Sequence, residues 1–406
     1  QLPEVQDKIK EYFDRYPFPQ ALDIEPLINN GLREPFDIHD DINYLFPENP
    51  NKKIETVLII GCGCNELIYH ALRNPDINFT GIDFSDVVES HVLNVINDKQ
   101  LSNVSFIKDD FINYNNMKYD LIYACDVINF NPNPSKALNT ITNSLNDQGA
   151  IVISLPSSYY YNSIDLLKEK IRFLDLYYTN EKDIDYAFNL VKSLIAVHPS
   201  KVNIYESSIS KGSLEVISKD NFVYRFLSPN NKTYNIYDLD KLLKKSGLCF
   251  QNWNDNASYF PQALFQADNP TLPNIIDRFK DKDILDIWDT ILSIKGPHHT
   301  VQKHRFCARK GINLNHFKDM MFEDDTFIFK RPNQIISPNT SKTQIHLVRT
   351  NYKRILTDKE YEVISAIDKP LQYKELKKTL DFSIERLNGT LQSLWEYSVI
   401  SFYKDK

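Results

Sequence analysis

The amino-acid sequence predicts an α/β fold built on a parallel, doubly wound sheet, with helical insertions and a winged-helix-like segment at its C-terminal end. Short apolar runs alternate with segments of helical spacing from residue 56 onward, which is typical of strand–helix–strand units. A glycine turn follows the first apolar run. At 406 residues the chain is long enough for two or three domains with a sizeable core.

The first fifty residues are expected to form an N-terminal helical lid, with a helix over Val5–Tyr16. Buried strands follow, and segments of helical spacing separate them. The expected strands are Thr56–Ile60, Phe79–Ile82, Val104–Ile107, Tyr119–Ala124 and Ala150–Leu155. The expected helices are Asn65–Arg73, Ser85–Asp98, Ser135–Leu145, Ser163–Thr179 and Glu181–Val197, the last two within a helical insertion at about 160–200.

The second half of the chain is expected to close the sheet and then to form a separate domain. A helix over Tyr237–Ser246 ends at a glycine, and strands over Leu248–Trp253 and Phe306–Ala308 form an antiparallel pair around a second helical insertion at 259–299. Residues 51–312 would then form one domain. Residues 313–406 end in three helices and a short strand, which predicts the winged-helix-like domain.

Composition and charge narrow the classes of function. The chain is 42% hydrophobic and 25% charged, as in ordinary soluble proteins, and its net charge of −7 disfavours a large nucleic-acid-binding surface. The five cysteines suit a reducing cytoplasm better than a disulfide framework. Because no apolar run approaches the roughly 20 residues of a membrane span and no signal peptide is visible, we expect a cytoplasmic protein.

The first strand runs into a turn that contains Gly61 and Gly63 before a helix begins. Gly61 permits a sharp exit from the strand, and Gly63 lets the backbone approach a ligand near the free N–H groups of the helix. Asn65 takes the place of a third glycine, and asparagine best tolerates a left-handed backbone. Alone, the pattern equally describes a tight strand–helix turn.

Acidic residues at the ends of the next two strands favour a nucleotide-like cofactor. Asp83 ends the second strand, where a carboxylate accepts hydrogen bonds from both ribose hydroxyls, and Phe84 could pack on an adenine. Asp110 follows the third strand and offers a carboxylate to an adenine amino group. The residue at position 83 serves NAD and S-adenosylmethionine equally, whereas the acidic residue after strand three is typical of methyltransferases.

Over about Ile54–Leu155 the sequence resembles the class I S-adenosylmethionine-dependent methyltransferases, whose seven-stranded sheet is Rossmann-like. The resemblance implies that Gly61 and Gly63 lie near the methionine moiety and that the backbone of Cys125 meets its ammonium group. It places Asp83 on the ribose and Asp110 with Phe111 at the adenine. In one departure, the apolar Ile59 replaces an acidic residue common in the first strand.

Two further segments resemble the methyltransferases with a so-called regulatory region, whose best-known members are protein-lysine methyltransferases that modify outer-membrane proteins in rickettsiae. These segments are Tyr12–Pro19 and Tyr234–Tyr259. The resemblance favours a protein acceptor, with lysine as the modified residue. Tyr12 would close over the cofactor, although core packing explains it equally. Asn129-Phe130 departs from the paired histidines common in the subgroup.

The candidate catalytic residues follow the fourth and fifth strands. Asp126 could orient an ammonium group or take its proton, or simply form a turn, and Asn129 lies on the same rim. Of the three consecutive tyrosines after strand five, Tyr160 represents the one or two expected at the site, and packing explains the rest.

Other patterns carry no metal or nucleic-acid prediction. His298, His299 and His304 lack a carboxylate partner pattern, and Cys62-x-Cys64 lies inside the glycine turn without a second pair. From residue 351 onward ten Lys/Arg stand against nine Asp/Glu, so no basic recognition face is visible. We therefore expect no nucleic-acid partner, and the C-terminal domain is assigned to protein contact or to a homodimer.

Three functional hypotheses remain. The first is methylation of a protein side chain. The second is methylation of a small molecule with a thiol, amine or hydroxyl group, inside a pocket walled by the aromatics between Phe222 and Phe265. The third is a regulator that binds the cofactor without turnover, which the missing histidine pair suggests. An open groove would favour the first hypothesis and a capped pocket the second.

Overall fold

The computed structural model describes residues 2–30, 36–115, 117–197, 218–265, 269–295, 300–311, 319–332, 334–338, 343–347 and 352–405. The chain divides into two compact units. Unit 1 comprises Gln1–Leu32, Ile54–Gly247 and Lys295–His304, and unit 2 comprises Arg33–Lys53, Leu248–Ile294 and Arg305–Lys406. Among the residues in these described ranges, no helix is long and apolar enough to cross a membrane.

A seven-stranded sheet of order β3-β2-β1-β4-β5-β7-β6 organises the fold. The strands β1 to β5 pair in parallel, and β6 and β7 form the expected antiparallel pair. Their bounds are β1 Thr56–Ile60, β2 Asn78–Asp83, β3 Val104–Lys108, β4 Tyr119–Cys125, β5 Leu145–Pro156, β6 Leu248–Trp253 and β7 Lys303–Lys310. The predicted Rossmann-like seven-stranded sheet is confirmed.

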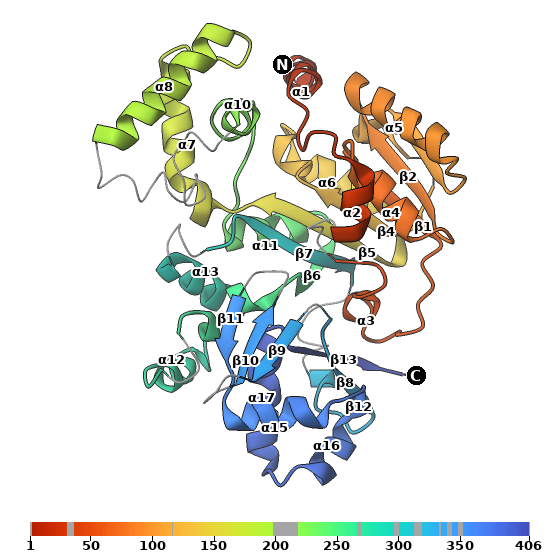
Figure 1. The fold of residues 1–406 in the computed structure, drawn as a ribbon, viewed down its shortest axis with the longest axis vertical. Coiled ribbons are helices and arrows are strands. Elements are labelled where there is room, and N and C mark those ends of the chain that lie inside the picture. Colours follow the sequence, from red (N-terminus) through yellow and green to blue (C-terminus); the bar gives the residue numbers. More distant parts are fainter. Residues whose placement is uncertain are drawn as a thin grey trace. The chain divides into compact units, whose positions relative to one another are not determined.

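Local sequence explains the helices that alternate with these strands in unit 1 (Figure 1). The Ser85 side chain caps α5 by accepting a hydrogen bond from Val88 N, and Asn133 caps α6 in the same way ahead of Pro134. In β1 the residues Val57 to Ile60 are buried, as expected for a parallel strand covered on both faces. These helices are α4 Glu66–Arg73, α5 Asp86–Lys99 and α6 Pro134–Asn143.

Three predicted helix boundaries are wrong, including the expected end at Thr179 of a helix that stops at Phe173. The helix expected to reach Leu145 ends at Asn143, because Leu145 already pairs with Tyr119 in the sheet, ahead of an irregularity in the β4–β5 register. The helix expected from Ser163 begins at Ser158 as α7 (Ser158–Phe173). The three consecutive tyrosines therefore lie in the first turn of a helix and not in a loop, so their side chains point in different directions around its axis.

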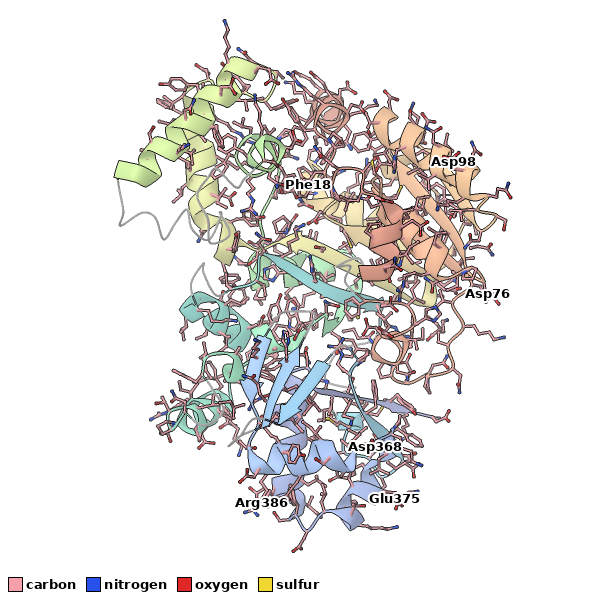
Figure 2. The ribbon with its side chains drawn as sticks, viewed as in Figure 1. Phe18, Asp76, Asp98, Asp368, Glu375 and Arg386 are labelled. Atoms are coloured by element: carbon pink, nitrogen blue, oxygen red, sulfur yellow. The ribbon has the colours of Figure 1, made fainter. Side chains whose placement is uncertain are left out.

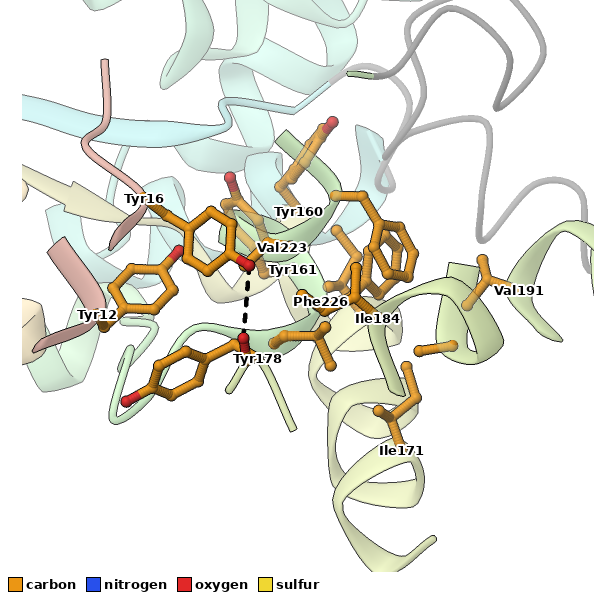
Figure 3. Packing of buried hydrophobic residues seen from close by; sticks show 14 residues of the cluster. Tyr12, Tyr16, Tyr160, Tyr161, Ile171, Tyr178, Ile184, Val191, Val223 and Phe226 are labelled. Carbon is orange, nitrogen blue, oxygen red and sulfur yellow. Dashed lines mark hydrogen bonds between the residues drawn. The ribbon is translucent and has the colours of Figure 1, made fainter. Parts of the chain in front are cut away.

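Several of the remaining helices of unit 1 pack around an aromatic cluster (Figure 3). Tyr12 of α1 and Tyr16, which follows that helix, meet Tyr178 there, and the Tyr16 hydroxyl donates to Tyr178 O at 3.5 Å. The cluster also contains residues of α7, α8 and η4, a short π-helix. Bounds are α1 Leu2–Arg15, α2 Ile24–Asn30, α8 Glu181–Val197, α10 Lys219–Phe222, η4 Val223–Leu227 and α11 Ile236–Lys245.

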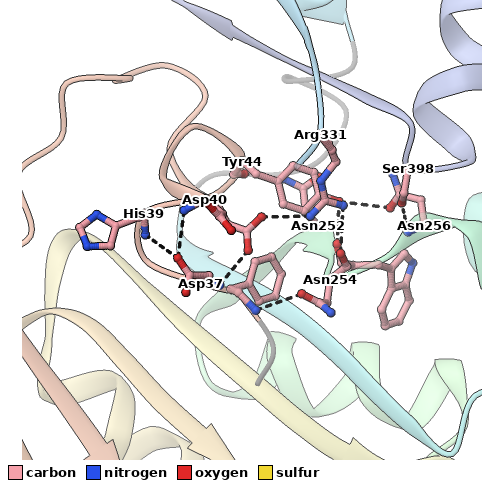
Figure 4. A network of polar contacts seen from close by, with 12 residues as sticks. Asp37, His39, Asp40, Tyr44, Asn252, Asn254, Asn256, Arg331 and Ser398 are labelled. Carbon is pink, nitrogen blue, oxygen red and sulfur yellow. Dashed lines mark hydrogen bonds and ion pairs between the residues drawn. The ribbon is translucent and has the colours of Figure 1, made fainter. Parts of the chain in front are cut away.

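Unit 2 is held by a buried polar network around Arg331 (Figure 4). The Arg331 guanidinium pairs with Asp41 at 3.1 Å, donates to Asn254 O at 3.0 Å and lies over the Tyr44 ring. The Ser398 hydroxyl accepts from Asn256 N at 2.6 Å. These contacts join segments far apart in the sequence, so the network stabilises the fold of this unit.

The C-terminal part of unit 2 follows the expected order of three helices and a strand. A three-stranded sheet of order β12-β8-β13 accompanies these helices, and β9, β10 and β11 form another. The winged-helix-like assignment remains a prediction. Bounds are α3 Ile42–Leu45, α12 Leu272–Phe279, α13 Ile284–Lys295, β8 Thr326–Lys330, β9 Gln334–Pro338, β10 Thr343–Leu347, β11 Tyr352–Ile355, α15 Asp358–Ala366, β12 Leu371–Gln372, α16 Tyr373–Thr379, α17 Ile384–Glu396 and β13 Ile400–Lys404.

Candidate cofactor and acceptor site

The glycine turn after β1 needs both of its glycines. Gly61 and Gly63 adopt positive φ angles of 59° and 53°, a left-handed conformation that favours glycine. A Cβ atom at position 61 would lie 2.5 Å from Val127 Cγ2, whereas at position 63 it would meet no atom within 4 Å. The backbone at Gly63 therefore faces open space, as a turn that approaches a ligand requires.

Asn65 does not act as a substitute for a left-handed glycine, so that part of the sequence interpretation is wrong. Its φ and ψ of −116° and −41° are right-handed. Its buried side chain instead binds the N-terminal segment. The Asn65 Oδ1 accepts a hydrogen bond from Leu22 N, and its Nδ2 donates one to Gln20 O, both at 2.9 Å. The position uses an asparagine because both ends of the amide make hydrogen bonds.

Asp83 ends β2 beside the glycine turn, as the spacing predicts. Its carboxylate accepts from Gly63 N at 3.1 Å and from Ser85 N at 3.0 Å. Burial raises the pKa of Asp83, and these backbone hydrogen bonds oppose the shift. Phe84 is half-buried, with its ring centroid 6.5 Å from that of Phe13 on α1.

Asp110 follows β3 and caps the short helix η1 (Phe111–Asn113), accepting from Ile112 N at 3.1 Å. Its second oxygen accepts from Gln6 Nε2 of α1 at 2.6 Å, and Phe111 beside it is buried. Asp110 and Phe111 thus follow β3 as expected, and a side chain of α1 donates to the Asp110 carboxylate, while their role at an adenine stays a prediction.

The α1 helix makes further polar contacts next to Asp83. Asp14 accepts from the Ser85 hydroxyl and from Asp86 N, both at 2.8 Å, and Lys10 pairs with Asp86 at 2.9 Å. The charge of Asp14 also adds to the factors that raise the pKa of Asp83. The N-terminal helix therefore contacts the carboxyl ends of two strands that carry candidate cofactor residues.

Cys125 is the last residue of β4 and is half-buried, and Asp126 follows it with φ at +55°. Asp126 N donates to Ser154 O at 3.0 Å, which holds this unusual backbone in place. The Asp126 carboxylate forms an ion pair with Lys303 through Oδ2. Its other oxygen, Oδ1, is buried and meets no hydrogen-bond partner within the described ranges.

Asn129 and Tyr160 lie in fixed positions. Asn129 is fully buried, and its Nδ2 donates to Asn231 Oδ1 at 2.8 Å, while its own Oδ1 has no partner among residues the structure describes. The Tyr160 hydroxyl accepts from Gln302 Nε2 at 3.0 Å. Tyr160 is thus tied to the segment just before β7, and its ring lies 4.9 Å from that of Tyr161.

Tyr12 is fully buried in the aromatic cluster, and its hydroxyl has no partner in the described parts of the chain. Burial raises the pKa of Tyr12. Phe18 stacks on Tyr224 of η4 with ring centroids 4.0 Å apart. Burial raises the pKa of Tyr224, and the charge of Asp126 raises it further. The N-terminal segment therefore reaches the neighbourhood of Asp126 through an aromatic layer.

Sequence reasoning missed three residues of this site. Lys303 is the first residue of β7, Gln302 precedes it, and Gln6 lies on α1. The only available signal was the position of Lys303 three residues before the expected closing strand Phe306–Ala308. A single lysine in that place has no distinctive sequence pattern.

The other patterns from the sequence do not build a metal site. No group of three potential ligands was found within the described residues, which do not include His298 and His299. His304 is fully buried, and burial lowers its pKa to about 4, with its Nε2 2.9 Å from Tyr234 O. Cys62 and Cys64 are buried free cysteines, and burial raises the pKa of Cys64 to about 11.

Residues 51–226 match a family described as a methyltransferase domain. Two solved structures resemble the chain over most of its length. PKMT2 from Rickettsia typhi in complex with AdoHcy is 16% identical, with 92% of this chain and 76% of that chain covered and a TM-score of 0.62. A structure of PKMT2 from Rickettsia typhi is 17% identical, with 96% and 77% covered and a TM-score of 0.56. At these identities the likeness shows the fold.

Fold and domain together define the class of the protein. The chain carries a methyltransferase domain over residues 51–226 on a Rossmann-like seven-stranded sheet, and both findings support its assignment as an S-adenosylmethionine-dependent methyltransferase. The predictions of fold class, enzyme class and cofactor are confirmed at this level. The residues of the glycine turn fit such a cofactor, because open space faces Gly63 next to the carboxylate of Asp83.

Proposed function

We propose that this methyltransferase modifies an amino group of a protein side chain, with lysine favoured. The observation that carries the proposal is Asp126, a left-handed residue at the end of β4. Lys303 holds one oxygen of its carboxylate, and the other oxygen is buried without a partner in the part of the chain described. Buried carboxylate oxygens normally accept hydrogen bonds, so Asp126 Oδ1 is suited to a donor that the acceptor supplies.

The donor side of the reaction follows from the glycine turn and the strand ends. S-adenosylmethionine supplies, when bound, a methyl carbon activated by a sulfonium. In this proposal Gly61, Gly63 and the backbone of Cys125 lie against its methionine moiety. Asp83 holds the ribose, and Asp110, with Phe84 and Phe111 beside it, holds the adenine. Since the methyl group needs no further activation, the protein mainly aligns the acceptor and excludes water.

The acceptor side must also deal with a proton. A lysine ammonium cannot attack until it loses one. A nearby carboxylate can receive this proton, and the apolar surroundings of buried tyrosine rings disfavour the charged amine. Asp126 supplies the carboxylate in this proposal, and Tyr161 and Tyr224 supply buried rings. Methyltransferases with a regulatory region commonly have a histidine at the position of Asn129. Because an asparagine side chain does not titrate, Asp126 is the residue that accepts the proton in this proposal.

The fold likeness to PKMT2 and the sequence resemblance in Tyr12–Pro19 support a protein acceptor over a small molecule. The rival reading rests on the buried aromatic layer formed by Tyr12, Phe18 and Tyr224, which is equally suited to wall a small pocket. The two readings differ in where a transferred methyl group is recovered.

Transfer from radiolabelled S-adenosylmethionine into a cell lysate, followed by mass spectrometry of the labelled species, tests the proposal. We expect label on protein lysines. The Asp126→Asn variant should transfer roughly 10²–10⁴-fold more slowly, with cofactor affinity within a factor of about two. The matched control is Asp98→Asn, at an exposed position on α5 (Figure 2).

Label recovered only in metabolite extract would replace the protein acceptor with a small molecule. Binding of the cofactor with no transfer to either fraction would favour the regulator. If Asp126→Asn kept full activity on protein, the assignment of the proton to Asp126 would be wrong while the enzyme class stood.

A further inference from the structure

A π-helical turn lies next to the proposed acceptor residues. The helix α10 continues into η4, whose five residues Val223–Leu227 form a π-helix. Such turns are rare and often occur at functional sites. In η4 the side chains of Val223 and Phe226 are fully buried in the aromatic cluster, and Tyr224 stacks on Phe18. The wide turn thus fixes the residue between them, Arg225, against the interior of unit 1.

Arg225 has a buried atom that the protein leaves unsatisfied. The side chain is half-buried, and its Nη1 is buried without a hydrogen-bond partner among the described residues. A guanidinium stays charged at every physiological pH, so a guanidinium nitrogen that is buried without a partner is unfavourable until a ligand supplies an acceptor. The natural partner of a guanidinium is a planar oxyanion, which accepts two parallel hydrogen bonds.

Two carboxylates that act on Tyr161 together with Arg225 already have partners. Asp126 has its ion pair with Lys303, and Asp165 of α7 accepts from the Thr233 hydroxyl at 2.8 Å. Lys168 and Arg172, which follow Asp165 on the same helix, add two positive charges near it. Positive charge therefore exceeds negative charge around this part of α7 and η4, and none of these groups neutralises Arg225.

Arg225 and Asp126 act on the same two tyrosines. Burial raises the pKa of Tyr161, and the charge of Arg225 opposes that shift while Asp126 adds to it. The pKa of Tyr224 is affected by the same two charges in the same directions. The two tyrosines therefore lie within electrostatic range of both the guanidinium and the carboxylate. Tyr224 is also the residue next to Arg225 in η4 and stacks on Phe18, so the geometry of η4 supports a position for Arg225 near the proposed acceptor residues.

We propose that Arg225 binds an anionic group of the methyl acceptor, a carboxylate or a phosphate. This inference rests on the proposed function, because that proposal brings the acceptor to Asp126. For a protein acceptor the group would be an acidic side chain close in sequence to the modified lysine. Asp126 then binds the amino group of the acceptor, and Arg225 binds the neighbouring anion. The two residues together recognise an acceptor that carries a positive and a negative group side by side.

A direct binding test needs no knowledge of the acceptor. Inorganic phosphate and succinate, added to the full chain at constant ionic strength, should raise the melting temperature of the wild type by about 2 °C or more, in a saturable manner. Arg225→Gln should lose this shift, and Arg225→Lys should retain part of it. The control is Arg386→Gln, at an exposed position on α17 that Figure 2 labels, which should behave as the wild type. Equal shifts in the wild type and in Arg225→Gln overturn the inference.

A second measurement separates acceptor binding from cofactor binding. With the labelled acceptor fraction as substrate, Arg225→Gln should raise KM roughly 10–100-fold, the loss of a charge-assisted pair. The dissociation constant for S-adenosylmethionine should change less than about twofold. If cofactor affinity falls tenfold instead, Arg225 binds the carboxylate of the cofactor and the inference is wrong. If label appears on a small anionic molecule with the same dependence on Arg225, the protein acceptor fails while the anion site stands.

Discussion

The donor and acceptor sides of this site differ in how the protein satisfies their polar atoms. On the donor side Asp83 accepts two backbone hydrogen bonds, and Asp110 accepts one from the backbone and one from Gln6. On the acceptor side Asp126, Asn129 and Arg225 each have a buried polar atom without a partner in the described chain. The protein itself satisfies the two carboxylates of the donor side, whereas these three residues of the acceptor side each leave an atom for another group to satisfy.

This difference indicates what kind of ligand each side of the site binds. A donor site that binds a fixed ligand can use backbone N–H groups and carboxylates that the fold already orients. The unsatisfied atoms of the acceptor side carry a cost that only a bound partner removes. The residues that lack partners therefore indicate the chemistry of the acceptor, which is an amino group near Asp126 and an anion near Arg225 in our proposals.

The largest effect expected from the donor side concerns the glycine turn. Gly61→Ala should lower the free energy of unfolding by roughly 2–4 kcal/mol, because it adds a left-handed alanine and a contact with Val127. Gly63→Ala should cost only about 1–2 kcal/mol and should weaken cofactor binding, since its Cβ projects into open space. Denaturant unfolding and titration calorimetry distinguish the two. Equal stability losses with unchanged affinity would contradict the placement of the ligand at Gly63.

A smaller effect tests whether the two sides are separable. Asp83→Asn should weaken S-adenosylmethionine binding by roughly 10–100-fold, because charge-assisted hydrogen bonds to the ribose are lost. Titration calorimetry of Asp83→Asn and of Asp126→Asn provides the comparison, with Asp98→Asn as the control. If both variants lose cofactor affinity equally, the division into donor and acceptor sides breaks down.

The smallest effect concerns the strand that carries Lys303. Burial lowers the pKa of the adjacent His304 to about 4, so this residue stabilises the fold fully above its unfolded pKa of about 6.5. The stabilisation is lost as the pH falls from that value toward 4. Between pH 7.5 and 5.5 the wild type should lose roughly 1 kcal/mol more stability than His304→Gln. Identical losses would show that His304 is not held neutral in the folded chain.

Sequence alone predicted that the candidate cofactor residues of the first two strands lie together, because these residues are close in the chain. Gly61, Gly63 and Asp83 lie at the ends of consecutive strands, and parallel strands bring their carboxyl ends to one edge. Apolar runs predicted β1 to β4 closely because buried parallel strands have few polar residues. The predicted end of α6 was wrong because the helical spacing of apolar residues continues through Leu145. In the structure, Leu145 pairs with Tyr119 of β4 instead.

The acceptor side depends on contacts that no local pattern encodes. Lys303 reaches Asp126 across 177 positions, and Gln6 reaches Asp110 across 104. Arg225 lies in a π-helix, whose wider hydrogen-bonding pattern has no recognised sequence signal comparable to a capping residue. Asn65 illustrates the opposite error, because its residue type fitted a left-handed turn while its side-chain hydrogen bonds set its actual role.

The backbone at Asp126 constrains what evolution can place there. Glycine, asparagine and aspartate are the residues that adopt its left-handed conformation at least cost, and asparagine keeps the shape while removing the charge. On the proposed role of Asp126, a single substitution would turn a catalyst into an inert cofactor-binding protein without disturbing the fold. The residue at this position would then distinguish active methyltransferases from inactive chains that share this architecture.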